Sequence, residues 1–231
     1  MEKEIAYSLI RSKKRKRTLS LRITHDGRII MQVPYRTPQE EIDRFFQAKT
    51  AWVKKKLIEM ESSAGKNAGE PIAFIPGERF LYLGERYPLK IQDTNGRKTP
   101  LSLSWGTFIL DEKRTEHAKD LFIKWYKHEA KRLFADRTNY YSNNLGLFPK
   151  GIRITSAQFR YGSCSPDNKL SFSWRLIMSP LAVIDYVIVH ELMHVKEKNH
   201  SERFWGLVEG AMPDYKRHRC WLREHGHLLR I

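Results

Sequence analysis

Residues 186–194 read Tyr186-Val187-Ile188-Val189-His190-Glu191-Leu192-Met193-His194, an apolar run interrupted by two histidines and a glutamate. At 3.6 residues per turn, His190 and His194 stack on one face of a helix, so both imidazoles can reach one metal ion. Glu191 points about 100° away, beside such an ion, where its carboxylate can take a proton from a bound water. A helix that is apolar nearly all round is buried, and a metal ion would compensate the polar groups inside it. The stretch therefore predicts a buried helix that holds a catalytic metal site.

A third metal ligand is expected downstream, because catalytic zinc usually takes three protein ligands and leaves one position for water. Asn199 can end the helix, and together with Glu202 it resembles a capping box for the next one. His200 would then begin that next helix near the first two histidines, and we predict it as the third ligand. Glu209 and His218 are the alternatives, since a carboxylate on the following helix also completes zinc sites. The predicted cofactor is one Zn²⁺ per chain.

The sequence around this site predicts an α+β catalytic domain over residues 111–231. Ser179-Pro180 is a favourable N-cap and first residue for the metal-site helix, which we expect to continue to about residue 198. The other expected elements are a long helix over 115–143, strands over 152–159 and 170–176, and helices over 200–210 and 213–225.

Residues 1–110 predict a β-rich N-terminal module crossed by one helix. Apolar residues alternate over 19–23 and 29–33 around Asp26-Gly27, which predicts a hairpin. Pro38 opens a helical pattern, and residues 62–69 lack large apolar side chains, which predicts a flexible connection. The remaining expected elements are short strands over 80–83, 87–91 and 101–110.

Composition indicates a soluble cytoplasmic protein of 231 residues, 41% of them hydrophobic. No apolar run reaches the eighteen or so residues of a membrane helix, so no membrane partner is expected. The first residues place their charges after a short apolar stretch, the reverse of a secretory signal. Two cysteines, Cys164 and Cys220, make no disulfide framework, which fits a reducing compartment.

The chain has a formal net charge of +16 and a sequence pI near 9.9. Such a charge attracts anions, so a nucleotide or a nucleic acid is a candidate partner through the basic surface. An alternative role for the densest block is to protect a strand edge from pairing. This block consists of Arg11, Lys13, Lys14, Arg15, Lys16 and Arg17.

The metal-site stretch and several flanking segments resemble the YgjP-like metallopeptidase family, which is related to the WLM peptidases. Besides residues 186–194, the resemblance rests on Asn199-His200-Ser201, Phe204-Trp205, Met212-Pro213-Asp214-Tyr215, Arg160-Tyr161-Gly162-Ser163-Cys164, Trp174-Arg175-Leu176-Ile177, Pro34 and Ala51-Trp52-Val53-Lys54-Lys55. It implies a zincin-like fold and zinc bound by His190, His194 and His200. Tyr161 stands where the family usually has tryptophan, and residues 62–110 do not align with it.

The resulting functional prediction is a zinc-dependent metallopeptidase with Glu191 as general base, acting on a peptide or protein substrate. The strand over 170–176 is expected to align the substrate by β-augmentation. Arg160, Tyr215 and His218 are candidate transition-state or substrate contacts.

Two alternatives remain open at this point. One is a zinc-dependent phosphohydrolase of the nucleoside triphosphate pyrophosphatase type, which would need several cations aimed at the metal. The candidates for these cations are Arg160, Arg175, Lys196 and Lys198. The other is a nucleic-acid-associated protease that resembles the SprT-like proteins and docks through the basic N-terminal block.

Overall fold

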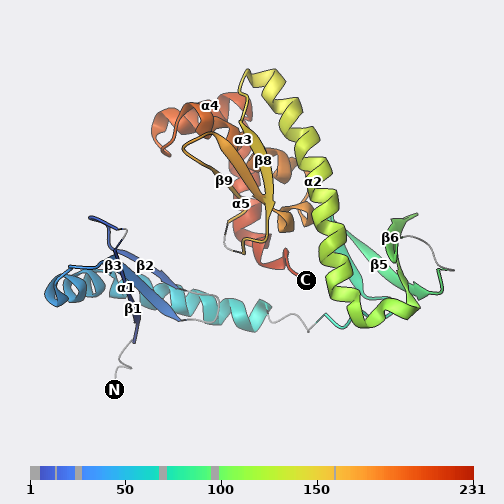
Figure 1. The fold of residues 1–231 in the computed structure, drawn as a ribbon, viewed down its shortest axis with the longest axis horizontal. Coiled ribbons are helices and arrows are strands. Elements are labelled where there is room, and N and C mark those ends of the chain that lie inside the picture. The colour runs from blue at the N-terminus through green and yellow to red at the C-terminus, as the bar shows by residue number, and fades with distance from the viewer. Residues whose placement is uncertain (1–5, 14, 24–27, 68–71, 95–98, 159) are drawn as a thin grey trace. The chain divides into compact units, whose positions relative to one another are not determined.

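The computed structural model describes residues 6–13, 15–23, 28–67, 72–94, 99–158 and 160–231 (Figure 1). The chain divides into two compact units, Met1–Pro71 and Ile72–Ile231, which we describe separately. Both contain helices and strands, which confirms the predicted α+β class. Among the described residues, no helix combines the length and the apolar character needed to cross a membrane.

The first unit is a three-stranded sheet with one helix. Its strands are β1 (Ser8–Ser12), β2 (Ser20–Ile23) and β3 (Ile29–Pro34), in the order β1-β3-β2. β2 pairs antiparallel with β3, which confirms the predicted hairpin, although its Asp26-Gly27 turn lies outside the described residues. β1 pairs parallel with β3.

Helix α1 (Gln39–Asn67) begins directly after Pro38, as predicted. It continues through most of the segment predicted as a flexible connection, so that prediction was wrong for residues 62–67; residues 68 and 69 lie outside the described part. Ser, Ala and Lys are compatible with a helix, and a single glycine, which costs about 1 kcal/mol, does not end a helix that has already begun. Ile42 of α1 is fully buried with Met31 and Val33 of β3, and this cluster is the core of the unit.

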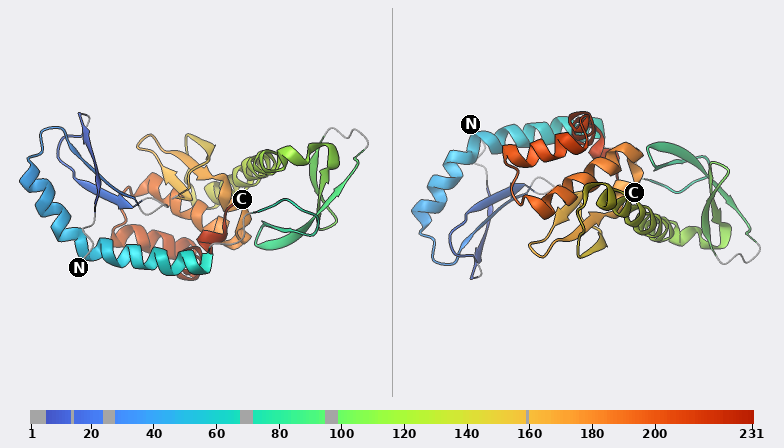
Figure 2. Two further views of the ribbon diagram at one scale, coloured as in Figure 1. Left: turned by 90° about the horizontal axis from the view of Figure 1, so that it is seen from below. Right: turned by 90° about the horizontal axis from the view of Figure 1, so that it is seen from above.

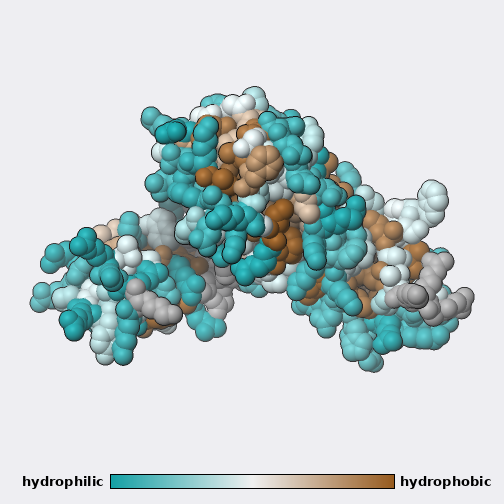
Figure 3. Space-filling model, turned by 45° about the horizontal axis from the view of Figure 1, so that its top comes forward, coloured by the Kyte–Doolittle hydropathy of each residue, from teal (hydrophilic) through white to brown (hydrophobic). Residues whose placement is uncertain are grey.

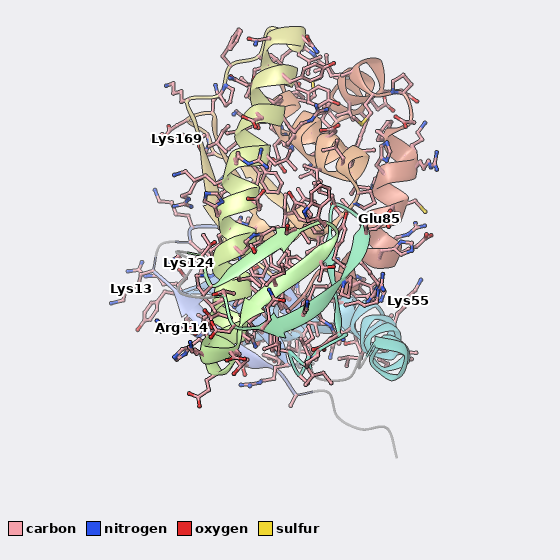
Figure 4. All side chains as sticks on the ribbon, turned by 90° about the vertical axis from the view of Figure 1, so that its right-hand side faces the viewer. Lys13, Lys55, Glu85, Arg114, Lys124 and Lys169 are labelled. Atoms are coloured by element: carbon pink, nitrogen blue, oxygen red, sulfur yellow. The ribbon has the colours of Figure 1, made fainter. Side chains whose placement is uncertain are left out.

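The second unit begins with a four-stranded sheet in the order β4-β5-β7-β6. Its strands are β4 (Arg79–Tyr82), β5 (Glu85–Gln92), β6 (Leu101–Ser104) and β7 (Thr107–Asp111). The single strand predicted over 101–110 is a hairpin, because Trp105 and Gly106 both have positive φ and reverse the chain. Figure 4 shows this sheet across the N-terminal part of the long helix, near Lys124.

The boundary between the units falls after Pro71, whereas the sequence placed it after residue 110. Phe80 of β4 and Phe108 of β7 pack on Phe122 of the long helix, with ring centroids 4.1 Å and 5.0 Å apart. This sheet therefore shares its hydrophobic core with the second unit. A sequence pattern shows that a strand has an apolar face, but it does not show which element covers that face.

Helix α2 (Ala118–Leu145) follows a 3₁₀ turn, η1 (Glu112–His117). The helix predicted over 115–143 therefore begins three residues late and ends two residues later than expected. Gly146 ends it in the left-handed conformation, with φ of 65°. Every fourth residue from 118 to 142 is buried, so α2 presents one narrow stripe to the core. Figure 2 shows α2 running between the β4–β7 sheet and helices α3–α5.

A second sheet in this unit has the order β8-β10-β9, from β8 (Gly151–Thr155), β9 (Gly162–Cys164) and β10 (Lys169–Ser173). β8 and β10 are parallel, and β9 is antiparallel to β10. The predicted strands over 152–159 and 170–176 are both too long. The chain leaves β10 in a 3₁₀ turn, η2 (Trp174–Met178). β9 lies between the two predicted strands, where the sequence predicts no further strand.

Three helices complete the unit: α3 (Leu181–Lys196), α4 (Glu202–Ala211) and α5 (Tyr215–His225), followed by the 3₁₀ turn η3 (Gly226–Leu228). Two predicted caps were wrong. Pro180, not Ser179, occupies the N-cap of α3, and the Ser179 hydroxyl donates to the Leu176 carbonyl over 2.7 Å. α4 is capped by Ser201, whose hydroxyl accepts from the Phe204 N–H, and not by Asn199.

Candidate metal centre and active site

Helix α3 places the predicted site residues in the core of the second unit. All eleven of its buried residues lie between Val183 and His194, so the helix is enclosed as its apolar sequence predicted. His190 and His194 are one turn apart, and their ring centroids lie 5.0 Å from each other. His194 is only 8% exposed, whereas His190 is half-buried.

His200 joins these two histidines from the connection between α3 and α4. Its Nε2 lies 3.0 Å from Nε2 of His190 and 3.2 Å from Nε2 of His194. A zinc ion about 2.0–2.1 Å from two imidazole nitrogens, at the tetrahedral angle, holds those nitrogens about 3.3 Å apart. Among the described residues, these three histidines are the group with ligand atoms close enough to hold one ion. The donor set therefore fits zinc.

Hydrogen bonding and burial leave the imidazoles ready to bind a cation. Nδ1 of His194 lies 3.0 Å from the Glu197 carbonyl oxygen, which can only accept, so the proton is on Nδ1 and Nε2 keeps its lone pair. Burial, and after it the neighbouring imidazoles, lower the pKa of His190 to about 3. Burial also lowers the pKa of His194. Both rings are therefore neutral near pH 7, as metal binding requires.

Helix α4 lines one side of the histidine cluster with aromatic rings. Phe204 is fully buried, and its ring centroid lies 4.9, 4.4 and 4.9 Å from those of His190, His194 and His200. Trp205 follows, 5.6 Å from His190 and 5.7 Å from His200. These rings keep the imidazoles in place and reduce their contact with water.

Glu191 lies between α3 and strand β9. It is 5% exposed, and its Oε2 has no hydrogen-bond partner in the part of the chain that the structure describes. A β-carbon added to Gly162 of β9 would lie 2.5 Å from the other carboxylate oxygen, so the glycine makes room for this side chain. Burial raises the pKa of Glu191 to about 8, although the charge of Arg160 lowers it in part. A divalent cation among the histidines would lower this pKa further.

The alternative third ligands are engaged elsewhere. Glu209 is exposed and forms an ion pair with Lys216 over 3.0 Å. Nε2 of His218 lies 2.9 Å from the Asp214 carboxylate. Neither residue joins the histidine group, which leaves His200 as the third member.

The predicted substrate contacts lie at different depths. Arg160 is exposed and close enough to Glu191 to affect its pKa. Tyr215 and His218 are buried, and both contact Tyr186, with ring centroids 6.4 Å apart in each case. Tyr186 in turn lies 5.9 Å from His190. His218 therefore reaches the histidine cluster through Tyr186, and Tyr215 also stacks on Trp205, with ring centroids 5.4 Å apart.

The predicted anion-binding block lies in the first unit, and two of its arginines make internal hydrogen bonds. Arg11 donates to the Tyr35 and Thr37 carbonyls over 3.2 Å and 2.7 Å. Arg15 donates to the side chains of Ser20 and Gln32, each over 2.9 Å. Lys13 lies over the Tyr35 ring, Lys16 and Arg17 are exposed, and Lys14 lies outside the described residues.

Sequence reasoning missed Gly162 and Arg219. Gly162 belongs to one of the stretches that carry the family resemblance, and no local signal in the sequence shows that its neighbour is Glu191. Arg219 of α5 lies over the Trp205 ring, with its guanidinium carbon 4.7 Å from the centroid. Its position in a basic helical segment gave no reason to distinguish it from the other arginines there.

An apolar groove elsewhere in the second unit is separate from this site. It has a volume of about 290 Å³ and is lined by Leu145, Leu147, Met193, Lys196, Gly206, Leu207, Gly210 and Ala211. None of the three histidines, nor Glu191, lines it. Figure 3 shows hydrophobic residues among mostly hydrophilic ones on the face of this unit turned to the viewer.

A match to a known protein family agrees with these observations. The YgjP-like metallopeptidase domain family matches residues 17–225. A solved structure, the metallopeptidase zymogen abylysin of Pyrococcus abyssi, is 22% identical, with a TM-score of 0.37 over 42% of this chain and 96% of that one. None of the curated proteins compared matches the chain. The family match spans nearly the whole sequence, confirms the resemblance and fits the zincin-like fold class. The chain belongs to the YgjP-like metallopeptidases.

Proposed function

We propose that the protein is a zinc-dependent metallopeptidase in which His190, His194 and His200 hold the ion and Glu191 is the general base. The observation that supports this most directly is the position of Glu191. Its carboxylate is buried beside three convergent imidazole nitrogens, and one of its oxygens has no partner among the described residues. A buried carboxylate without a hydrogen-bond partner destabilises the folded protein, so a glutamate at this position fits a catalytic role.

The roles of the residues follow from this arrangement. When bound, zinc acts as a Lewis acid that lowers the pKa of its water and polarises the scissile carbonyl. Glu191 accepts the proton of the attacking water and passes it to the leaving amine. The hydrogen bond from Nδ1 of His194 to the Glu197 carbonyl orients one ligand ring. Phe204 and Trp205 exclude water from one side of the site.

An extended peptide would bind along strand β9 rather than along β10. β10 is paired on both edges, by β8 and by β9, so the predicted augmentation of β10 is not available. The Tyr161 carbonyl accepts from the Ser173 N–H of β10, so alternate residues Gly162 and Cys164 turn their backbone groups to the other edge of β9. Gly162 lies against Glu191, so a substrate strand hydrogen-bonded to this edge would run close to that carboxylate.

The phosphohydrolase alternative is less well supported by the cations near the metal site. Arg175 donates to the Ser156 carbonyl and lies over Trp174. Lys196 lines the apolar groove, and Lys198 hydrogen-bonds the Ser165 carbonyl and Asn168. Of the four candidate cations, only Arg160 remains available near Glu191. Phosphoryl transfer needs several cations around the phosphate.

The proposal is tested with wild type and the Glu191→Gln variant, purified and loaded with zinc. Elemental analysis should find about one zinc per chain in both, because Glu191 is not a ligand. Mass spectrometry of a proteome-derived peptide pool should show cleavage by wild type and a decrease of about 10²–10⁴-fold in the variant. Glu202→Gln, an exposed carboxylate change on α4, is the control and should cleave normally.

Undiminished cleavage by Glu191→Gln would remove Glu191 from the base role. A zinc-loaded wild type that leaves every peptide intact, yet releases phosphate or pyrophosphate from nucleoside triphosphates, would replace the peptidase by the phosphohydrolase.

A further inference from the structure

Arg219 places a positive charge beside the histidine cluster. Its guanidinium lies over the ring of Trp205, 4.7 Å from the centroid, and that ring is itself 5.6 Å from His190 and 5.7 Å from His200. A guanidinium stacked on indole is restrained by a cation–π contact and loses little freedom when it binds a ligand. Arg219 is therefore held in place while its donors face solvent, since the residue as a whole is exposed.

No carboxylate neutralises Arg219 in the described part of the chain. The three acidic side chains nearest to it in the sequence are engaged with other bases. Asp214 lies against His218, Glu209 against Lys216 and Glu224 against Arg223. Lys216, three residues before Arg219, bonds Glu209, whereas Arg219 contacts the Trp205 indole and has no ion-pair partner among the described residues.

Arg219 carries an exposed positive charge that only the Trp205 ring separates from His190 and His200. The same charge repels a divalent metal ion bound by the histidines. An uncharged residue at position 219 could cover the Trp205 ring equally well. The arginine is explained if a bound ligand supplies a negative charge next to the metal.

We propose that Arg219 is a specificity-determining residue that binds a carboxylate of the substrate beside the scissile bond. Arginine forms two parallel hydrogen bonds to a carboxylate, and this geometry favours it over other cations for the task. The carboxylate is either an acidic side chain or the free carboxyl terminus of the peptide. This inference rests on the proposed peptidase function, since it assigns the substrate class of the same site.

The first test measures binding and needs no turnover. The probes are the monohydroxamates of malonate, succinate and glutarate, each paired with its neutral amide counterpart, titrated into zinc-loaded protein by calorimetry. Both members of a pair bind zinc through the same group and differ in one carboxylate. For the probe whose chain is long enough to reach Arg219, the acid should bind about tenfold tighter than the amide, as expected for a hydrogen-bonded charge pair.

Variants of Arg219 decide whether this residue makes the difference. Arg219→Gln should reduce the ratio of acid to amide affinity to about one. Arg219→Lys, which keeps the charge but loses the paired donors, should show an intermediate ratio. Arg217→Gln removes the same charge from an exposed position on the same helix, two residues away, and should keep the wild-type ratio.

Three binding outcomes would overturn the proposal. They are equal binding of acid and amide at every length, a preference for the acid that persists in Arg219→Gln, and no hydroxamate binding at all. The last outcome would remove the metal centre as well.

A second arm separates the two sources of the carboxylate. Cleavage beside Asp or Glu in peptides with amidated carboxyl termini would identify a side chain, and cleavage restricted to peptides with free termini would identify the terminal group. Cleavage with neither preference would overturn the proposal, as would an equal loss of activity on acidic and neutral peptides in Arg219→Gln. A protein that cleaves nothing contradicts the peptidase function, and the hydroxamate ratio then decides on Arg219 alone.

Discussion

Gly162 of strand β9 lies directly against Glu191 of helix α3. A β-carbon at position 162 would be 2.5 Å from Oε1 of the glutamate and 2.6 Å from its Cγ. Both distances are far shorter than a van der Waals contact between these atoms, so the glutamate can keep its position only while residue 162 is a glycine.

Gly162→Ala should therefore displace the Glu191 carboxylate without removing any metal ligand. We expect turnover to fall by at least tenfold, since a misplacement of about 1 Å costs up to 10²-fold in rate. Zinc content should stay at the wild-type value. Gly151→Ala on β8 of the same sheet is the control, because a β-carbon there meets nothing within 4 Å. Unchanged turnover in Gly162→Ala would show that Glu191 tolerates another position.

His200→Ala should weaken zinc binding without unfolding the protein. Loss of a partner that only orients a ligand reduces metal affinity by about 10–100-fold, so loss of the ligand itself should exceed 100-fold. The side chain is exposed, and the melting temperature of the metal-free protein should stay close to wild type. Competition with a chromophoric chelator measures the affinity. His227→Ala, which changes another exposed histidine, should keep the wild-type zinc affinity. An unchanged zinc affinity in His200→Ala would indicate a different third ligand.

The ion pair between Arg137 of α2 and Asp185 of α3 should stabilise the second unit. Its two hydrogen bonds are both 2.6 Å long, and the Asp185 side chain is 9% exposed. Asp185→Ala leaves a partly buried guanidinium unpaired and should lower the free energy of unfolding by roughly 2–3 kcal/mol. Lys216→Ala breaks the exposed pair with Glu209 and should lower the free energy of unfolding much less, because water screens this pair. Urea denaturation measures the free energy of unfolding of both variants, and equal losses in the two would contradict the prediction.

Gly226→Ala should destabilise the end of the chain through Tyr161. The Tyr161 hydroxyl donates to the Gly226 carbonyl over 2.9 Å, and a β-carbon on Gly226 would overlap that hydroxyl. We expect a loss of about 1–3 kcal/mol, typical of overpacking. Tyr161→Phe removes the oxygen, so Gly226→Ala should cost less in that background. Additive effects in thermal or urea denaturation would show that the two residues do not interact in this way. This contact also gives the tyrosine that replaces the usual tryptophan a specific partner.

Several elements could be predicted because their information is local. The buried face of α2 repeats every fourth residue, and the apolar residues of α3 surround the histidine pair. Hydrophobic periodicity depends on neighbours within a turn or two, and this is what a sequence pattern records. The hairpin of β2 and β3 is local in the same sense.

Long-range packing explains the elements that could not be predicted. Strand β9 is three residues long, too short for an alternating pattern, and it forms because β10 offers it hydrogen bonds. The β4–β7 sheet belongs to the second unit because its phenylalanines meet Phe122 of α2. Caps are sensitive to the path of the chain, and for this reason Ser201 rather than Asn199 begins α4.

The one-dimensional pattern was sufficient for the helix that holds His190, Glu191 and His194, because the relative directions of side chains one or four residues apart follow from helix geometry. It was also sufficient to recognise the family. Three contacts join residues from different elements: His200 with His190, Gly162 with Glu191, and Arg219 with Trp205. Their positions depend on how those elements pack, and packing is a property of the whole folded unit rather than of any segment.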